Sequence, residues 1–393
     1  MPSEELRALL AESEAAACAR RARAWALALR ARLGVGEDSP VVLFGAGRLG
    51  RRMARALRCV GAKAVAFADN GRARWGETVE GLPVLSPNEA VARFGATHPF
   101  VVSIWSPGHR FVETAAQLEA LGCACVAPFQ LLVWRYPDAL LPHFFFDLPE
   151  RILARRGELA RSFGLLGDDR SRAEFVAQLR WRLRLDAAGL PEPAGAQAYW
   201  DRTILAPADG ELFVDCGAFD GDTVTAFLHA HQNRFGGIVA YEPDAGTLRK
   251  LQATVEALAP DVRGRIVVRH AAVAAQQGVA RFDADGAMHS SISETGTVEV
   301  PAVTLDAELA GRRPTFVKMD IEGAELAALR GAARVVREAR PVLAICVDHR
   351  PEDLWAIPAL ITELVPDYVH AFRSHGTEGF DTIWYGVPPE RRP

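Results

Sequence analysis

The sequence has few cysteines, no long apolar run and little excess charge, and each of these scarcities excludes a class of protein. Its six cysteines form no Cys-x-x-Cys pair, and no histidine is spaced to complete a zinc site with them. Reduced thiols in a cytoplasmic protein are therefore expected rather than disulfides. No apolar run approaches the roughly 18 residues of a transmembrane helix. The first residues also lack the basic start and apolar core of a secretory signal.

The charge balance argues against two further classes of protein. A net charge of −4 leaves no general basic surface for nucleic acid or for an anionic membrane. With 49% hydrophobic and 24% charged residues, the composition is that of an ordinary globular protein. A chain of 393 residues is long enough for two cores. We therefore expect neither a nucleic-acid nor a membrane partner, and the composition is compatible with a homo-oligomer.

The second half of the chain is organised around residues 212–223. An apolar run ends in Asp215 and is followed by Gly217, Gly221 and the pair Asp222-Thr223, a pattern typical of a strand that turns sharply into a helix. The first amides of that helix would point at whatever lies over the turn and favour a carboxylate or phosphate there. Many such turns bind nothing, so this motif alone is weak evidence of a site.

A second strand adds to this motif. Residues 237–241 are apolar and end in Glu242, at the spacing of about 20 residues at which an acid can bind both ribose hydroxyls in a doubly wound sheet. Further on, Ala271-Ala272-Val273 is a stretch of small residues suited to lying against an adenine. The sequence thus predicts a pocket for an adenosine-bearing ligand, lined by Asp215, Gly217, Gly221, Asp222, Thr223, Glu242 and Ala272.

The first half contains a similar unit. A strand at residues 41–44 precedes Gly45-x-Gly47-x-x-Gly50, and a helix then leads to a strand that ends in Asp69. This is the dinucleotide fingerprint in its usual context. It is either a nucleotide or nicotinamide site, or a Rossmann-like module that keeps the turn for packing alone. Residues 67–84 also resemble the small nucleotide-binding modules attached to sugar-modifying enzymes.

These patterns predict an α/β protein with two doubly wound, Rossmann-like domains. We expect a helical segment at 1–35, continuous over 4–33, and then a nucleotide-binding module at 36–130. A helical connector at 131–198 follows, with a Pro- and Gly-rich linker at 189–195. The second α/β domain spans 199–393. The aromatic run 144–146 is expected to pack between domains or against a second subunit.

Several motifs of the second domain occur together in one known family. Residues 199–387 resemble the FkbM family of S-adenosylmethionine-dependent methyltransferases, through the stretches 213–223, 240–243, 304–306, 317–325, 329–332 and 349–355. The resemblance implies S-adenosylmethionine as cofactor and methyl transfer to a hydroxyl, commonly on a sugar or a polyketide-type natural product. It also implies a class I methyltransferase sheet that ends in an antiparallel hairpin. Cys216 departs from many members but is small and apolar.

Acid and histidine residues follow the neighbouring strands and are expected to converge at the carboxyl edge of the sheet. His349 is the first candidate for a general base, because an unperturbed imidazole titrates near neutral pH; alternatively it only bridges strand and helix. Asp320 and Glu322 are further catalytic candidates or caps of their own helix. Glu325 is expected to form an ion pair on the helix surface, and His375 is a weaker second base.

Two alternatives stay open. Asp320, Asp348 and His349, with Glu322, could instead bind magnesium or manganese and acidify a sugar diol. In a different class of function, the Gly45 turn would be the active centre of an NAD(P)-dependent oxidoreductase or of a sugar-nucleotide-binding protein. The sequence shows no catalytic Tyr-Lys or Cys-His set, which counts against the oxidoreductase.

Overall fold

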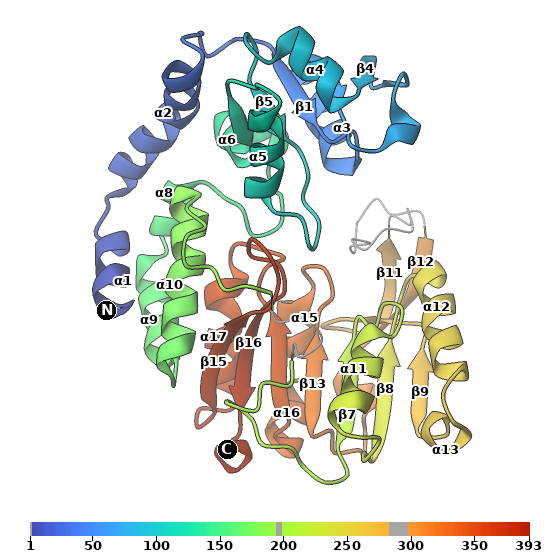
Figure 1. Cartoon of the computed structure of the whole chain (residues 1–393). Helices are drawn as coiled ribbons and strands as arrows, with labels where there is room; N and C mark the ends of the chain where they lie inside the picture. Colours follow the sequence, from blue (N-terminus) through green and yellow to red (C-terminus); the bar gives the residue numbers. More distant parts are fainter. Residues whose placement is uncertain (1, 194–198, 283–297) are drawn as a thin grey trace. The chain divides into compact units, whose positions relative to one another are not determined.

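The computed structural model describes residues 2–193, 199–282 and 298–393, and the chain divides into two compact units (Figure 1). The N-terminal unit comprises Glu4–Arg156 and Leu179–Ala188. The C-terminal unit comprises Met1–Ser3, Gly157–Gln178 and Gly189–Pro393. The helix α10 (Asp169–Arg184) therefore contributes residues to both units. Among the residues described, none of the helices combines the length and apolar character that spanning a bilayer requires.

The N-terminal unit is built on a six-stranded sheet of order β3-β4-β2-β1-β5-β6. All neighbouring strands pair in parallel except β3 and β4, which form a short hairpin. The apolar runs expected to be strands are buried at its centre. The strands are β1 (Val41–Phe44), β2 (Ala64–Ala68), β3 (Thr78–Val79), β4 (Leu82–Leu85), β5 (Phe100–Val102) and β6 (Val126–Pro128). The helices are α3 (Arg48–Cys59), α4 (Pro87–Phe94), α5 (Phe111–Ala120), α6 (Gln130–Arg135), α7 (Pro137–Leu140) and α8 (Pro149–Leu153).

Two local expectations for the first 150 residues need revision. The opening helix is not continuous: α1 (Pro2–Leu10) and α2 (Glu14–Arg32) are separate, because Ser13 caps α2 by accepting a hydrogen bond from the amide of Ala16. Phe145 and Phe146 of the aromatic run are buried in the N-terminal unit itself, and Phe144 is half-buried. Phe146 packs edge-on against Trp105, and the Arg182 guanidinium lies 4.4 Å from the centre of the Phe145 ring.

The C-terminal unit has a seven-stranded sheet of order β15-β16-β14-β13-β7-β8-β9. Its strands run parallel except β16, which is antiparallel to both neighbours. The expected terminal hairpin and the two doubly wound sheets are thus confirmed. The strands are β7 (Leu212–Cys216), β8 (Gly237–Tyr241), β9 (Ile266–Arg269), β13 (Phe316–Met319), β14 (Val342–Cys346), β15 (Val369–Ser374) and β16 (Thr382–Val387).

Helices and a small second sheet complete this unit. The sheet has the order β10-β12-β11, with β10 (Ala272–Val273), β11 (Gly278–Phe282) and β12 (Val298–Val303). The helices are α9 (Arg156–Leu165), α11 (Asp222–Ala230), α12 (Ala245–Glu256), α13 (Pro260–Arg263), α14 (Leu305–Glu308), α15 (Glu325–Arg330), α16 (Ala333–Ala339) and α17 (Asp353–Leu364). Gly331 separates α15 from α16, and a Cβ there would lie 2.1 Å from the carbonyl oxygen of Ala274.

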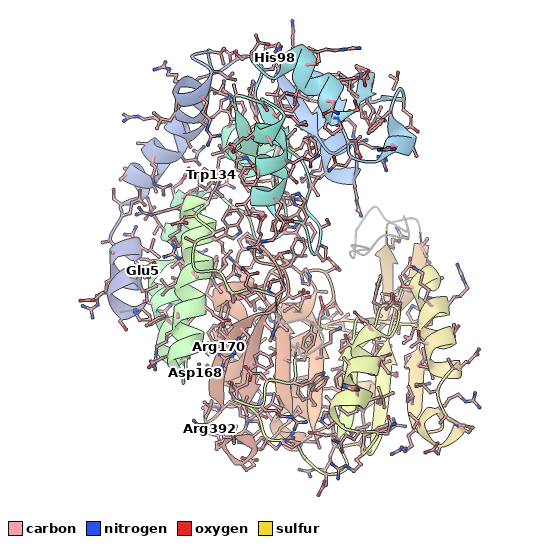
Figure 2. All side chains as sticks on the ribbon, viewed as in Figure 1. Glu5, His98, Trp134, Asp168, Arg170 and Arg392 are labelled. Carbon is pink, nitrogen blue, oxygen red and sulfur yellow. The ribbon has the colours of Figure 1, made fainter. Side chains whose placement is uncertain are left out.

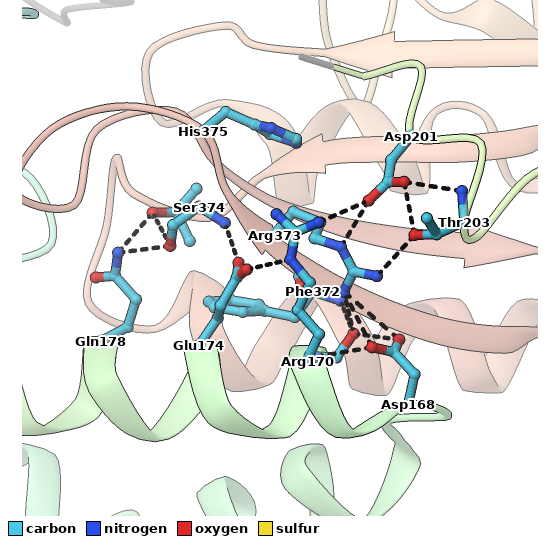
Figure 3. A network of polar contacts seen from close by, with 12 residues as sticks. Asp168, Arg170, Glu174, Gln178, Asp201, Thr203, Phe372, Arg373, Ser374 and His375 are labelled. Carbon is cyan, nitrogen blue, oxygen red and sulfur yellow. Dashed lines mark hydrogen bonds and ion pairs between the residues drawn. The ribbon is translucent and has the colours of Figure 1, made fainter. Parts of the chain in front are cut away.

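A buried polar network joins α10 to the edge strand β15 (Figure 3). It starts near Asp168, at the beginning of α10 (Figure 2). Arg373, 1% exposed, donates to Asp201 Oδ2 at 2.8 Å and to Ser171 Oγ at 2.6 Å, and it also contacts Asp168. Glu174 accepts a hydrogen bond from the amide of Ser374. The helix therefore covers an edge strand that would otherwise present unpaired backbone groups.

Candidate active site

The carboxyl ends of β7, β8, β13 and β14 meet at one edge of the large sheet, and a buried ion pair lies beneath that edge. Asp215 is fully buried, with Oδ1 3.0 Å from Lys318 Nζ. Burial raises the pKa of Asp215 to about 6. Burial opposes the charge of Lys318, but the carboxylates around it outweigh burial and raise its pKa. Lys318 also donates to the carbonyl of Gly217 at 2.7 Å, so the pair supports the glycine turn from below.

The glycine turn needs its glycines for packing. Gly217 has a φ of 83°, and a Cβ there would lie 1.9 Å from the carbonyl oxygen of Asp320. Gly221, with a φ of 91°, begins α11 without a side-chain cap. The exposed Asp222 accepts a hydrogen bond from the amide of the buried Thr223. Of the residues expected to hold a donor, Gly221, Asp222 and Thr223 thus lie at the start of α11, whereas Asp215 is fully buried.

Glu242 lies at the end of β8, as the sequence predicted, and is 6% exposed. Its Oε2 accepts the amide of Phe219 at 2.9 Å, and its Oε1 accepts the amide of Asp244 and the hydroxyl of Thr247, each at 2.8 Å. These donors use three of its about four lone-pair positions. Glu242 therefore fastens the glycine turn to the start of α12. Ala272 is buried in β10, where it pairs with Ala302.

His349 lies beyond β14 at the centre of a group of carboxylates. Its Nδ1 is 2.8 Å from Glu325 Oε1, and its Nε2 is 3.5 Å from Asp320 Oδ1 and 3.7 Å from Glu322 Oε2. The structure thus brings together the three residues predicted to be catalytic. Asp348, 6% exposed, adjoins them along the chain.

Glu325 corrects a prediction: it is fully buried and forms no surface ion pair. The helix α15 begins only at Glu325, because Glu322 and Gly323 adopt left-handed backbone angles, with φ of 56° and 96°. The first side chain of α15 therefore turns back to the sheet edge, where Glu325 Oε1 also accepts the amide of Ile321 at 2.7 Å. Neither Asp320 nor Glu322 caps this helix, whose N-cap is Ala324.

The carboxylates change the titration of His349. Burial lowers its pKa, but Glu325, Asp348 and Glu322 outweigh burial and raise the pKa well above its ordinary value. The expectation of a nearly unperturbed imidazole is therefore wrong. His349 therefore becomes a base only as the pH rises through this raised pKa.

Two further residues, Tyr199 and Asp381, lie at this edge. The hydroxyl of Tyr199 donates to Asp320 Oδ2 at 3.1 Å. Burial, together with the neighbouring charge of Asp320, raises the pKa of Asp381 to about 6. His375 lies on the same hairpin as Asp381, 2.9 Å from the hydroxyl of Tyr385, and burial lowers its pKa to about 4. The position of Tyr199 just after the linker was the only sequence signal for any role.

Packing explains two of the three glycines in the N-terminal turn. Packing accounts for Gly45, where a Cβ would lie 2.7 Å from Ile104 Cγ1, and for Gly50, where it would lie 2.0 Å from the carbonyl oxygen of Gly45. A Cβ at Gly47 would meet nothing within 4 Å. Asp69 accepts hydrogen bonds from the amides of Ala46 and Gly71, so its carboxylate already binds its own loops.

One group of side chains among the described residues could offer a metal three ligand atoms within 4.8 Å of one another: Asp320, Glu325 and His349. In it, Glu325 takes the place predicted for Asp348. However, Glu325 Oε1 already accepts the Ile321 amide and lies within hydrogen-bonding distance of His349 Nδ1. These three side chains fit a hydrogen-bonded carboxylate–imidazole pair better than they fit a metal site.

The strand order, the antiparallel last strand and the glycine turn after β7 define a class I methyltransferase fold. Residues 215–376 match the family model described as Methyltransferase FkbM domain. The residues that match this family model all lie in the C-terminal unit.

A solved structure supports the fold. A methyltransferase FkbM from Methylobacillus flagellatus KT is 22% identical, with a TM-score of 0.74, and the match covers 98% of this chain and 100% of that one. A UDP-D-quinovosamine 4-dehydrogenase from Vibrio fischeri is 20% identical over 26% of this chain and 98% of that one, with a TM-score of 0.20. A putative rRNA-methylase from Clostridium thermocellum is 8% identical over 50% and 97%, with a TM-score of 0.30. The last two scores are too low to carry an argument. Comparison with curated proteins found no match.

Proposed function

We propose that the C-terminal unit is an S-adenosylmethionine-dependent O-methyltransferase that acts on a hydroxyl of a sugar or natural product. The observation that carries the proposal is the position of His349 Nε2, which lies between Asp320 and Glu322 at the same sheet edge as the glycine turn. A base flanked by two carboxylates suits an acceptor with several hydroxyls, because each carboxylate can accept a hydrogen bond from a hydroxyl next to the reacting one.

The charges at this edge suit a cationic donor. Asp215 is paired with Lys318, whereas Asp320 and Asp222 both lie close enough to Asp381 to raise its pKa. We infer that the turn from Gly217 to Asp222, together with Glu242, would hold S-adenosylmethionine, which supplies a methyl group on a positively charged sulfur. All six cysteines are free thiols, which supports a reducing, cytoplasmic location.

The chain's own residues then have two tasks. Asp320 and Glu322 orient the acceptor so that its oxygen lies in line with the methyl group. His349, in its neutral form, takes the hydroxyl proton at Nε2 as the new O–C bond forms and the S–C bond breaks. The proton ends on the imidazole, and a neutral thioether leaves.

Donor binding is tested by replacing Glu242. Glu242→Ala removes an acceptor for a ribose and releases the amide of Phe219 in the turn, so we expect affinity for S-adenosylhomocysteine to fall by about 10- to 100-fold, as for the loss of one charged hydrogen bond. Isothermal calorimetry measures this. The matched control is Glu256→Ala, at the exposed end of α12, which should leave affinity unchanged.

The same titration separates the competing functions. Unchanged affinity in the Glu242→Ala variant would remove Glu242 from the donor site. Tight binding of NADH, with no response to S-adenosylmethionine or its product, would favour an oxidoreductase centred on the Gly45 turn. We further propose that the N-terminal unit recognises a nucleotide-linked part of the acceptor or mediates assembly. The open space at Gly47 supports the first role, because a pyrophosphate needs close approach to the backbone there.

Metal dependence gives a separate prediction. Because hydrogen bonds already engage Glu325 and the imidazole Nδ1, we expect methyl transfer to continue at its full rate after dialysis against EDTA. The initial rate is measured with and without added magnesium or manganese. A loss of activity in EDTA that either ion restores would contradict this and revive the metal hypothesis.

A further inference from the structure

Glu325 contacts the imidazole of His349 at Nδ1, whereas Nε2 faces Asp320 and Glu322. Glu325 is fully buried, and its Oε1 receives the amide of Ile321 at 2.7 Å and lies 2.8 Å from His349 Nδ1. The backbone amide can only donate, so it anchors this oxygen as an acceptor. A nitrogen facing an anchored carboxylate keeps its proton, which places the lone pair of a neutral ring on Nε2.

We propose that Glu325 is a positioning residue of the methyl transfer, which keeps a proton on Nδ1 of His349 so that Nε2 receives the proton of the acceptor hydroxyl. This inference rests on the proposed function. Glu325 touches neither donor nor acceptor, because no part of it reaches solvent. It acts through the ring: without it, the neutral imidazole could carry its proton on the nitrogen that has to accept one.

Other charged groups surround the ring, and they come from every element around it. They are Asp320 and Glu322 after β13, Glu325 on α15, Asp348 after β14, Asp353 on α17 and Asp381 before β16. Among these, Glu325 has the strongest effect on the pKa of His349, and it is the group that bonds to Nδ1. The other carboxylates affect the total charge around the ring, whereas Glu325 also affects which ring nitrogen is protonated.

Asp353 provides an internal comparison for Glu325. It is 1% exposed, and its Oδ2 accepts the amide of Arg350 at 2.9 Å. Burial, together with the negative charge of Glu325, raises the pKa of Asp353 well above its ordinary value. Asp353 thus bonds to the backbone of Arg350, whereas Glu325 bonds to the ring of His349 itself. Removing the charge of Glu325 should change His349, whereas an amide at position 353 should not.

The experiment compares Glu325→Gln with Asp353→Asn in the full chain. The glutamine can still accept the Ile321 amide, but its own amide group would donate to Nδ1 and force the proton onto Nε2. We expect nitrogen NMR of the His349 ring to show the proton on Nδ1 in the wild type and on Nε2 in Glu325→Gln, with a lower pKa. We expect kcat to fall by at least about 100-fold, as when an orienting carboxylate becomes an amide, with the acceptor KM within a few-fold. The acid limb of the pH–rate profile should move to lower pH.

The control variant and the outcomes that contradict the proposal give different results. Asp353→Asn should keep the wild-type tautomer, pKa and kcat within about two-fold. If Glu325→Gln does not fold, Glu325→Asp, which keeps the charge, should retain the Nδ1 proton and the raised pKa. An unchanged tautomer and pH profile in Glu325→Gln, or loss of the Nδ1 proton in Glu325→Asp, would overturn the proposal. If the wild type transfers no methyl group, the proposed function is contradicted but the role of Glu325 is not, because the NMR signals report on Glu325 without turnover.

Discussion

Replacing His349 by alanine is expected to lower the turnover of methyl transfer by about 10²- to 10⁴-fold, the usual contribution of a general base. Affinity for the donor should stay within a few-fold, because Glu242 and the glycine turn lie on other strands. Single-turnover methyl transfer and calorimetry with S-adenosylhomocysteine measure the two quantities. Wild-type turnover should rise with pH through a pKa above 6.5, since His349 accepts a proton only when neutral and its pKa is raised.

A second histidine serves as the control for this substitution. His229 lies exposed on α11, so His229→Ala should leave both turnover and affinity unchanged. Unchanged turnover in His349→Ala would remove His349 from the role of base. The candidates would then be Asp320 and Asp381, which lie at the same edge.

Arg373→Met is expected to lower the free energy of unfolding of the C-terminal unit by about 3–5 kcal/mol, the range for breaking a buried ion pair. The substitution leaves Asp201, Asp168 and the hydroxyl of Ser171 without their buried cation. Urea unfolding followed by tryptophan fluorescence measures the change. The control is Arg281→Ala, in an exposed pair with Glu299, which should cost less than about 1 kcal/mol.

The acid dependence of this network has a definite sign. Burial raises the pKa values of Asp168 and Asp201, but their hydrogen bonds and Arg373 outweigh burial and hold both below the ordinary 3.8. Their contribution to stability is therefore fully present above that value and is lost as the pH falls through the lower folded-state pKa values. Arg373→Met should weaken this acid dependence. A change in stability below about 1 kcal/mol at pH 7 would contradict the role given to the network.

The sequence predicted the fold where local patterns decide it. Apolar runs that end in glycine or an acid became the parallel strands, and the two short runs near the C-terminus became the antiparallel pair β15 and β16. It failed where a distant contact decides. At Gly331, between α15 and α16, the carbonyl of Ala274 approaches from another part of the chain and leaves no room for a Cβ.

The site was predictable to the same extent. His349, Asp320 and Glu322 could be brought together from topology alone, because parallel strands end at one edge. The partnership of Glu325 with His349 was missed, since it depends on left-handed backbone angles at residues 322 and 323 that delay the start of α15. Nor does a motif mark Asp381, which reaches the site from the terminal hairpin.

The contact between Gly217 and the Asp320 carbonyl has a consequence for variation in this fold. No side chain fits between the loop that follows β7 and the loop that follows β13, so the two backbones touch directly. Neither loop can shift without pushing the other. A substitution selected because it moves one loop would therefore also move the other loop. Exchanging the two loops together should preserve function better than exchanging either alone.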